Sequence, residues 1–314
     1  MILRALVLAV ATAALAPPDA RAQSFGDTIS IVEPFGPGSP SELAIRVLKP
    51  ALERALKARL LIEHIGSANG DAALARVAAG QPNGRMLLAI TDATRIFHEY
   101  QNNTPRKLDQ LKPVAKLTEG ISMALAMPHG SAIDTWEKFA AQAKAKPMPV
   151  AGFGPRSPSA LFQTMIERQV QARFASPRYD LDIEVLAAMA RDHEPGIVPT
   201  SSALSQPALG RPAPVVLLTS GARRHPSLPH VPTLAEVAGN QRLAFTISVG
   251  LFGPPGMDNA TAAALAGAVA TAGKDEAVRA EARKLSLPLA VNDSAVLMET
   301  MKRTRRVIQE LVHR

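Results

Sequence analysis

Three short loops rich in glycine and serine carry the residue types most suited to chemistry in this chain. They lie at 35–41, 66–71 and 154–159, and each follows an apolar run and precedes a helix-like pattern. Unpaired backbone N–H groups and the positive end of the helix dipole make a helix N-terminus attractive to anions. Each loop is therefore a candidate anion-binding site, and the three in series favour an anionic ligand.

The first loop, "GPGSPS" at 36–41, differs from the known nucleotide-binding loops. It has no lysine, so it does not match the G-x-x-x-x-G-K-[ST] pattern that cradles nucleotide phosphates. It has two glycines where the dinucleotide-binding G-x-G-x-x-G pattern needs three. Neither class of nucleotide site is therefore predicted.

Serine hydrolysis is the main enzymatic alternative. No G-x-S-x-G elbow occurs in the chain. Ser39 and Ser157 each stand directly before a proline that would open a helix, which is the pattern of an N-cap residue. Glu42 follows Ser39 by three residues and predicts a capping box. Helix capping is the interpretation that we adopt for both serines.

The residues that bind metals in other proteins form no convincing set. The only close histidine pair, His225 and His230, lies in a proline-rich stretch without a carboxylate-rich ligand set, so no metal site is expected. Asp180, Asp182 and Glu184 alternate, but a calcium loop needs more oxygen ligands and a glycine turn. These three acids are interpreted as solvent-facing or, alternatively, as part of a ligand-facing loop. No cofactor is predicted.

The elements that must position these loops alternate between strand and helix. Alternation of this kind predicts an α/β fold with parallel strands and right-handed crossovers. Strands are expected at 28–35, 60–64, 85–91, 121–128, 148–154, 213–221 and 244–255, and helices at 40–58, 71–80, 155–170, 258–273, 275–285 and 293–313.

Length and composition bound the possibilities further. A chain of 314 residues with 47% hydrophobic and 20% charged residues is expected to form about two globular domains. The net charge is +8, but lysine and arginine are scattered, and the densest cluster, at 301–306, is interpreted as a solvated helix face. Aromatic residues make up only 4%, so no nucleic-acid partner is expected.

The N-terminus has the pattern of a secretory signal. Arg4 precedes an apolar run at 5–16, and Ala20 to Ala22 fits the small-x-small cleavage rule. We predict a signal peptide at 1–22, cleavage after Ala22 and a periplasmic protein. The chain contains no cysteine, so it forms no disulfide.

Several stretches resemble one known family, the substrate-binding proteins of tripartite tricarboxylate transporters, or Bug receptors. "PFGPGSPSELAIR" at 34–46 is similar to the family signature P-F-x-x-G-G-x-x-D-x-x-A-R, with Ser39 for the second glycine and Glu42 for the aspartate. "EHIGSANGDAA" at 63–73 resembles its second glycine-rich loop. "LLTSGARRHPSLPHVPTLAEVAG" at 217–239 is similar to the long family stretch A-V-T-S-x-x-R-S-P-x-L-P-D-V-P-T-x-A-E-x-G.

The resemblance implies a type-II periplasmic-binding-protein fold, with two α/β lobes and a ligand cleft between them. By position, lobe 1 would comprise 24–122 plus 246–314, and lobe 2 would comprise 123–245. The implied function is that of an exported monomeric receptor, not an enzyme, which captures a small carboxylate for uptake or sensing and presents it to a membrane transporter or a sensor protein. A ligand-free interaction or sensory subunit, or a small hydrolase on the same cleft, remains the alternative.

The same resemblance assigns ligand-binding residues to both lobes. Backbone N–H groups of the first two loops would hold the carboxylate, and the third loop would meet it from lobe 2. The pattern departs from the family in the second loop and at 176–184, where the family's glycine is missing. The predicted site comprises Phe35, Gly36, Gly38, Ser39, Glu42, Ser67, Ala68, Asn69, Gly70, Asp71, Thr91, Gly154, Ser157 and Ser159.

Overall fold

The computed structural model describes residues 25–66, 70–102, 107–154, 157–175, 177–205 and 212–312 of the chain. The signal peptide predicted at 1–22 and the predicted site residues Ser67, Ala68 and Asn69 lie outside these ranges. Among the described residues, no helix combines the length and apolar character needed to cross a membrane.

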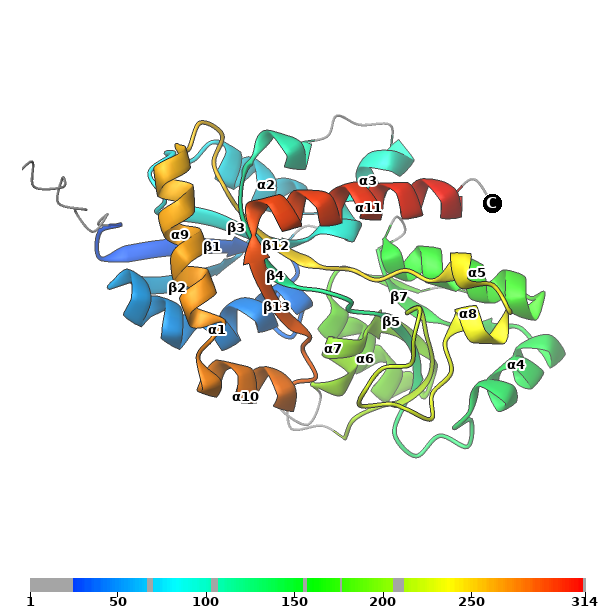
Figure 1. Ribbon diagram of the computed structural model, residues 1–314. Coiled ribbons are helices and arrows are strands. Elements are labelled where there is room, and N and C mark those ends of the chain that lie inside the picture. Colours follow the sequence, from blue (N-terminus) through cyan, green and yellow to red (C-terminus); the bar gives the residue numbers. More distant parts are fainter. Residues whose placement is uncertain are drawn as a thin grey trace, which may run out of the picture.

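A six-stranded sheet organises the first lobe, which lies at the left of Figure 1. Its strand order is β13-β4-β12-β3-β1-β2. The strands are β1 (Thr28–Glu33), β2 (Arg59–His64), β3 (Met86–Thr91), β4 (Lys112–Thr118), β12 (Val249–Gly253) and β13 (Leu289–Asp293). Its central strands β1, β3 and β12 are largely buried, as expected for a sheet with helices on both faces.

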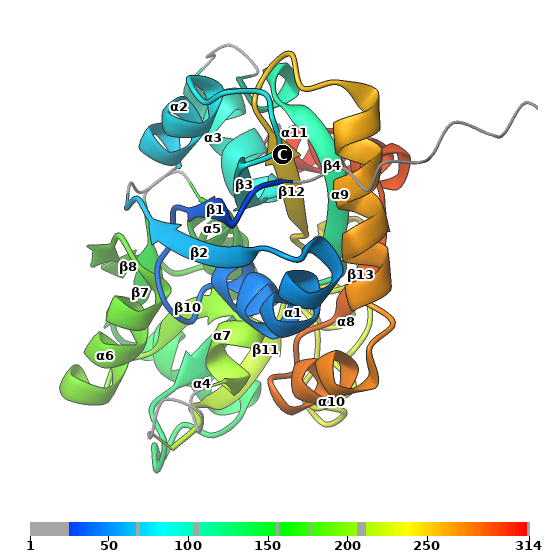
Figure 2. The same cartoon turned by 90° about the vertical axis from the view of Figure 1, so that its left-hand side faces the viewer.

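Helices cover both faces of this sheet (Figures 1 and 2). On one face α1 packs against α9 and α10, and on the other α11 packs against α3, with α2 beside them. The bounds are α1 (Pro40–Leu56), α2 (Asp71–Ala78), α3 (Asp92–Asn102), α9 (Asn259–Ala272), α10 (Glu276–Lys284) and α11 (Ser294–Val312), with a 3-10 turn at Lys107–Gln110. In Figure 1, α11 extends from the first lobe across the edge of the second.

The second lobe contains a five-stranded sheet of order β11-β5-β10-β7-β9 and a short two-stranded sheet, β6-β8. Its strands are β5 (Met123–Met127), β6 (Met148–Pro149), β7 (Ala151–Phe153), β8 (Phe174–Ala175), β9 (Arg178–Tyr179), β10 (Gly196–Pro199) and β11 (Val215–Thr219). Its helices are α4 (Trp136–Ala145), α5 (Pro158–Val170), α6 (Asp182–Asp192), α7 (Thr200–Leu204) and α8 (Leu234–Val237), with a 3-10 turn at Gln241–Leu243.

The expectation of parallel strands is correct for the short β6-β8 sheet and for part of each of the two larger sheets. β1 pairs in parallel with β2 and β3, and β7 pairs in parallel with β9 and β10. The other pairings, those of β4, β5, β11, β12 and β13, are antiparallel. The antiparallel strands include those that enter or leave a lobe, because the chain passes from β4 into β5 and returns through the segment before β12.

Two extended segments connect the lobes, and they pair with each other. The backbone N–H of Ile121 donates to the carbonyl of Ile247 at 3.1 Å, and that of Ile247 donates to the carbonyl of Ile121 at 2.8 Å. We call residues 244–248 the return segment. Because this pairing lies between the two sheets, it occupies the position where hinge residues occur in proteins of two lobes.

Candidate functional site

A small cavity lies where the two lobes meet. It offers about 20 Å³ to the centres of water molecules, which is room for about one water. Both lobes and both connecting segments contribute to it, and it is called the inter-lobe cavity below. Its lining comprises Phe35, Pro40, Thr91, Thr94, Met123, Phe153, Pro158, Ser159, Asp182, Pro199 and Ile247.

Four helix N-termini converge on this cavity. Pro40 is the first residue of α1, and Thr91 directly precedes α3. Pro158 and Asp182 are the first residues of α5 and α6 in the opposite lobe. The positive ends of these helix dipoles therefore face the same small volume, which favours negative charge there.

Ser39 caps the first of these helices, as predicted. Its Oγ accepts a hydrogen bond from the backbone N–H of Glu42 at 3.2 Å, and Pro40 occupies the first helical turn. The predicted capping box is wrong in its second half, because the Glu42 carboxylate accepts the N–H of Gly38 at 3.0 Å and not that of Ser39. Glu42 also pairs with Arg46 at 2.9 Å.

The first loop folds around a carboxylate of its own, that of Glu33. This side chain is fully buried at the end of β1. It accepts backbone N–H groups from Phe35 at 3.0 Å and Gly36 at 2.8 Å. It also accepts the hydroxyls of Ser39 at 2.8 Å and Ser41 at 2.5 Å. These bonds compensate the burial of the charge, since an ionised carboxylate is an acceptor with several lone pairs.

The N–H groups of this loop that were predicted to bind a ligand are therefore already bonded to carboxylates of the chain itself. In the described conformation the N–H groups of Gly36 and Gly38 already bond to Glu33 and Glu42. Both glycines have positive φ angles, +74° and +83°, which direct these N–H groups inward. A ligand at this cavity meets the rim of the loop, including Phe35 and Pro40, before it meets these N–H groups.

Glu33 also binds a histidine, but the arrangement lacks the order of a catalytic triad. His64 Nδ1 lies 3.2 Å from Glu33 Oε2, and this hydrogen bond raises the pKa of His64. Ser39 donates to the same carboxylate and is itself fully buried. A nucleophilic serine needs the histidine between itself and the acid, so this geometry gives Ser39 no base.

The described part of the second loop lies away from the cavity lining. Gly70, with a φ of +76°, directly precedes α2. Asp71 pairs with Arg95 at 2.7 Å, and Arg95 is buried and also bonds Glu99 at 2.9 Å. Asp71 is thus part of an ion-pair network within lobe 1, and its predicted contact with a ligand stays a prediction.

The third loop and the end of β3 bring predicted residues to the cavity. Ser157 caps α5, with its Oγ 3.3 Å from the N–H of Ala160, and it donates to the carbonyl of Gly154 at 2.9 Å. Ser159 lines the cavity, and its hydroxyl donates to the carbonyl of Ile197 at 3.1 Å. Thr91 lines it from lobe 1 and donates to Thr94 Oγ1 at 2.8 Å.

The three alternating acids have three different environments. Asp180 is exposed, and Glu184 caps α6 by accepting the N–H groups of Asp180 and Leu181, both at 3.1 Å. The solvent-facing interpretation is wrong for Asp182, which is only 6% exposed and lines the cavity. Burial raises the pKa of Asp182 to about 7, with the charge of Glu33 adding to the effect. The only hydrogen bond of its carboxyl to a described residue comes from Ser202, at 3.4 Å.

The lobes are closed over the cavity. The rings of Phe35 and Phe153 meet edge to face with their centroids 5.6 Å apart. Gly36 also lies against lobe 2, because a Cβ added to it would stand 3.2 Å from Leu181 Cδ2. Farther out, the hydroxyls of Ser227 and Ser286 lie 3.3 Å apart. A solute therefore enters only when these contacts separate.

Sequence reasoning missed Glu33 and Thr94, and it named Asp182 only within the alternative, ligand-facing interpretation of the three acids. Glu33 has one recognisable signal, its place at the carboxyl end of a parallel strand, where α/β proteins form their sites. Thr94 and Asp182 lie in the first turns of helices that the sequence pattern did not delimit. No group of three or more possible metal-ligating side chains occurs in the described part of the chain.

Comparison with known proteins accounts for this architecture. A model of the tripartite tricarboxylate transporter family receptor matches residues 44–313. The chain belongs to this receptor family. A UPF0065 protein of Cupriavidus necator is 26% identical over 260 residues, covering 80% of this chain and 77% of the relative. A UPF0065 protein of Bordetella bronchiseptica is 26% identical over 240 residues, covering 74% of this chain and 70% of the relative.

Several solved structures share the fold of this chain. The periplasmic binding protein BugD superimposes with a TM-score of 0.81 at 17% identity, covering 91% of this chain and 96% of BugD. MatC of Rhodopseudomonas palustris, with bound malate, superimposes with a TM-score of 0.78 at 21% identity. The match covers 91% of this chain and 99% of MatC. A second R. palustris protein, with adipate, superimposes with a TM-score of 0.81 at 16% identity. The match covers 92% of this chain and 97% of that protein. The predicted periplasmic-binding-protein fold is confirmed, and the family is one of solute-binding receptors.

Proposed function

We propose that this receptor is exported to the periplasm, captures a small carboxylate-bearing metabolite between its lobes and delivers it to a membrane transporter. The observation that carries the proposal is the convergence of the N-termini of α1, α3, α5 and α6 on the inter-lobe cavity. Such a convergence favours an anion without requiring a lysine or arginine. Malate and adipate, bound by two proteins of the same fold, are of this chemical class.

The side chains around the cavity suit a ligand with more than one polar group. Thr94 offers a hydroxyl proton from lobe 1, whereas the hydroxyls of Thr91 and Ser159 are donated to Thr94 and to the carbonyl of Ile197 in this conformation. The carboxyl of Asp182, when protonated, can donate a hydrogen bond to a ligand carboxylate. The cavity in the closed state is small, so the ligand enters an open cleft and is enclosed when the lobes close.

Calorimetry on unfolded and refolded protein, from which carried-over ligand has been removed, tests the proposal. A panel of mono-, di- and tricarboxylates should include at least one that binds with one-to-one stoichiometry. Thr94→Val, which keeps the shape and removes the hydroxyl, should weaken that binding about tenfold. Thr164→Val on α5, away from the cavity lining, is the matched control. If no carboxylate gives heat, the ligand-free interaction subunit becomes the better interpretation.

Export and delivery need measurements in cells. N-terminal sequencing of the protein from a periplasmic fraction should begin at Gln23. Deletion of the gene should abolish accumulation of the radiolabelled carboxylate identified by calorimetry. A lost transcriptional response with unchanged accumulation would instead indicate a sensing role.

A further inference from the structure

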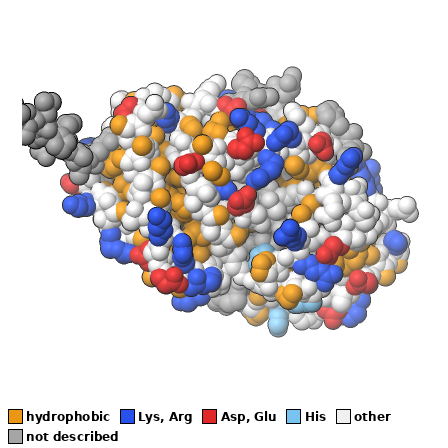
Figure 3. Space-filling model, in the orientation of Figure 1, with side chains coloured by type: hydrophobic (Ala, Val, Ile, Leu, Met, Phe, Trp, Pro, Cys, Tyr) orange, Lys and Arg blue, Asp and Glu red, His pale blue; other side chains and the backbone are white. Residues whose placement is uncertain are grey.

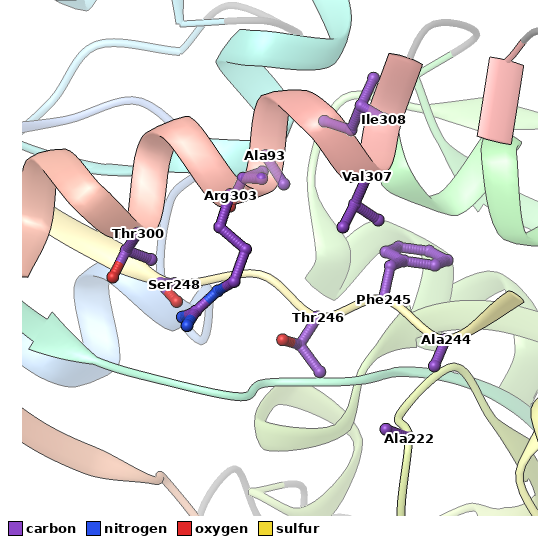
Figure 4. Close-up of a pocket in the computed structure, with 11 residues that line it drawn as sticks. Ala93, Ala222, Ala244, Phe245, Thr246, Ser248, Thr300, Arg303, Val307 and Ile308 are labelled. Atoms are coloured by element: carbon purple, nitrogen blue, oxygen red, sulfur yellow. The ribbon is translucent and has the colours of Figure 1, made fainter. Parts of the chain in front are cut away.

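A second cavity lies behind the return segment, between this segment and α11 (Figure 4). It offers about 180 Å³ to the centres of water molecules, far more than the inter-lobe cavity. A cavity of roughly 150 Å³ is large enough to bind benzene. We call this space the hinge pocket. It is large enough for a small organic molecule.

The hinge pocket and the inter-lobe cavity lie back to back. In the return segment, Ile247 lines the inter-lobe cavity, whereas its neighbours Thr246 and Ser248 line the hinge pocket. This alternation is that of extended chain, in which successive side chains point to opposite sides. The first turn of α3 also contributes to both spaces, because Thr94 lines the inter-lobe cavity and Ala93 lines the hinge pocket.

One end of the hinge pocket is polar and carries a guanidinium. Figure 4 shows Arg303, Ser248 and Thr246 toward one side of the pocket. Arg303 donates to Glu119 at 2.8 Å, and Lys116 donates to the same residue at 2.6 Å. The buried carboxyl of Asp92 also interacts with Arg303, so two basic and two acidic groups meet here, and burial raises the pKa of Asp92. A guanidinium has five N–H donors, and Glu119 occupies only part of them.

Two hydroxyls at this polar end are available to a ligand. The structure shows no hydrogen bond from the hydroxyl of Thr246 or Ser248 to any described residue, and Ser248 is only 4% exposed. The nearby carboxyl of Asp92 is already bonded by the N–H of Ser248 at 2.8 Å and the hydroxyl of Thr304 at 2.7 Å. Asp92 therefore holds the pocket wall and leaves the two hydroxyls free to bond elsewhere.

The other end of the hinge pocket is apolar. Phe245, Val307 and Ile308 lie together there in Figure 4, with Ala222 and Ala244 beside them. Phe245 also packs against Phe162 of α5, with the ring centroids 6.1 Å apart, so this wall is fixed to lobe 2. Val307 and Ile308 belong to α11, which packs on lobe 1. An occupant would thus contact both lobes from behind.

We propose that the hinge pocket is a second binding site, for a short amphipathic anion. The anionic head lies at Arg303 and the two hydroxyls, and the hydrocarbon part lies against Phe245 and Val307. Opening of the front cleft brings α11 and the return segment closer at the back, so an occupant opposes opening. Its effect on the front ligand, which rests on the proposed function, is slower release.

Hexanoate is a suitable probe, with acetate lacking the tail and hexanol lacking the charge. Calorimetry should show binding of hexanoate and weaker or no binding of the other two. Arg303→Gln should weaken hexanoate binding up to about fivefold, the range for a partly exposed charge pair. Ala222→Leu, which fills the apolar end, should abolish it. Arg306→Gln is the matched control, because Arg306 lies on the same helix, pairs with Glu299 and does not line the pocket.

The outcomes separate this site from the front cleft. No hexanoate binding to the native protein at millimolar concentration overturns the proposal. Binding that survives Ala222→Leu but is lost in Thr94→Val places hexanoate in the inter-lobe cavity, which overturns the hinge site and supports the proposed function. Loss in Ala222→Leu, with no heat from the di- and tricarboxylates, supports the hinge site and counts against the proposed function. Crystals soaked in 6-bromohexanoate should show anomalous bromine signal beside Val307.

Discussion

The carboxylate of Glu33 lies 2.8 Å from the backbone nitrogen of Gly36, inside the loop whose N–H groups the sequence assigns to a ligand. The loop thus encloses an anion supplied by the preceding strand. Ser39 and Ser41 add two hydroxyl donors from the same stretch of chain, and His64 of the neighbouring strand adds its ring nitrogen at 3.2 Å. This internal pairing organises the rim of the site before any solute arrives.

Glu33→Gln should destabilise the protein by about 2–4 kcal/mol, because the amide NH₂ would face N–H donors in a buried site. Urea unfolding at neutral pH measures the loss. Glu63→Gln on the adjacent strand is the matched control, since Glu63 is only partly buried and bonds Ser30. It should cost less than about 1 kcal/mol. Equal small losses in both variants would show that the Glu33 bonds contribute little.

His64 should titrate above its ordinary value of 6.5, because the Glu33 carboxylate favours the protonated ring. Proton NMR of the imidazole signals against pH measures this, and His64→Gln assigns the resonance. Glu33→Gln should return the pKa of His64 toward 6.5. A His64 signal unaffected by Glu33→Gln would contradict the pairing.

Asp182 should make the protein less stable as pH rises from about 4 to about 7. Its pKa is raised from 3.8 to about 7 in the folded state, so in this window the folded protein holds a proton that the unfolded chain has lost. The free energy of unfolding therefore falls as pH rises, until the group is ionised in both states. Asp182→Asn should flatten this part of the unfolding free energy against pH. Asp180→Asn, at an exposed position, should leave it unchanged.

Arg95→Leu should cost about 3–5 kcal/mol, because it leaves the buried carboxylate of Glu99 without its 2.9 Å partner. Asp71→Asn should cost less than about 1 kcal/mol, since Asp71 is half-exposed. Thermal or urea unfolding distinguishes the two. The same Asp71 variant tests its predicted contact with a ligand. A tenfold loss of carboxylate affinity with little loss of stability would support that contact.

The sequence predicts those parts of the structure that depend on local chemistry. Ser39 and Ser157 cap helices because a hydroxyl before a proline-led turn satisfies backbone donors wherever the helix later packs. The strands around the first three loops follow from equally local apolar runs. The antiparallel pairing of β12 with β3 and β4 joins strands far apart in the chain, so no local pattern shows it.

The prediction of the site residues is less complete, because they too depend on contacts between distant parts of the chain. Asp182 becomes a cavity residue only when α6 lies opposite the Glu33 loop, and the alternating acids do not show which of the three faces a ligand. Asp71 stands in the second loop, which resembles the family, yet its partner Arg95 lies on a helix that the pattern did not delimit. Site prediction here depends on which lobe surfaces meet, and that is a tertiary property.

The Glu33 loop has a consequence for the kinetics of capture. A loop that must order itself around an arriving solute gives up conformational freedom at that moment, and the loss reduces affinity. Here Glu33 orders the first loop during folding, so the solute meets a rigid rim. Movement of the lobes about the Ile121 and Ile247 pairing then remains the slow step. The observed association rate should therefore level off at high solute concentration, at a ceiling set by closure.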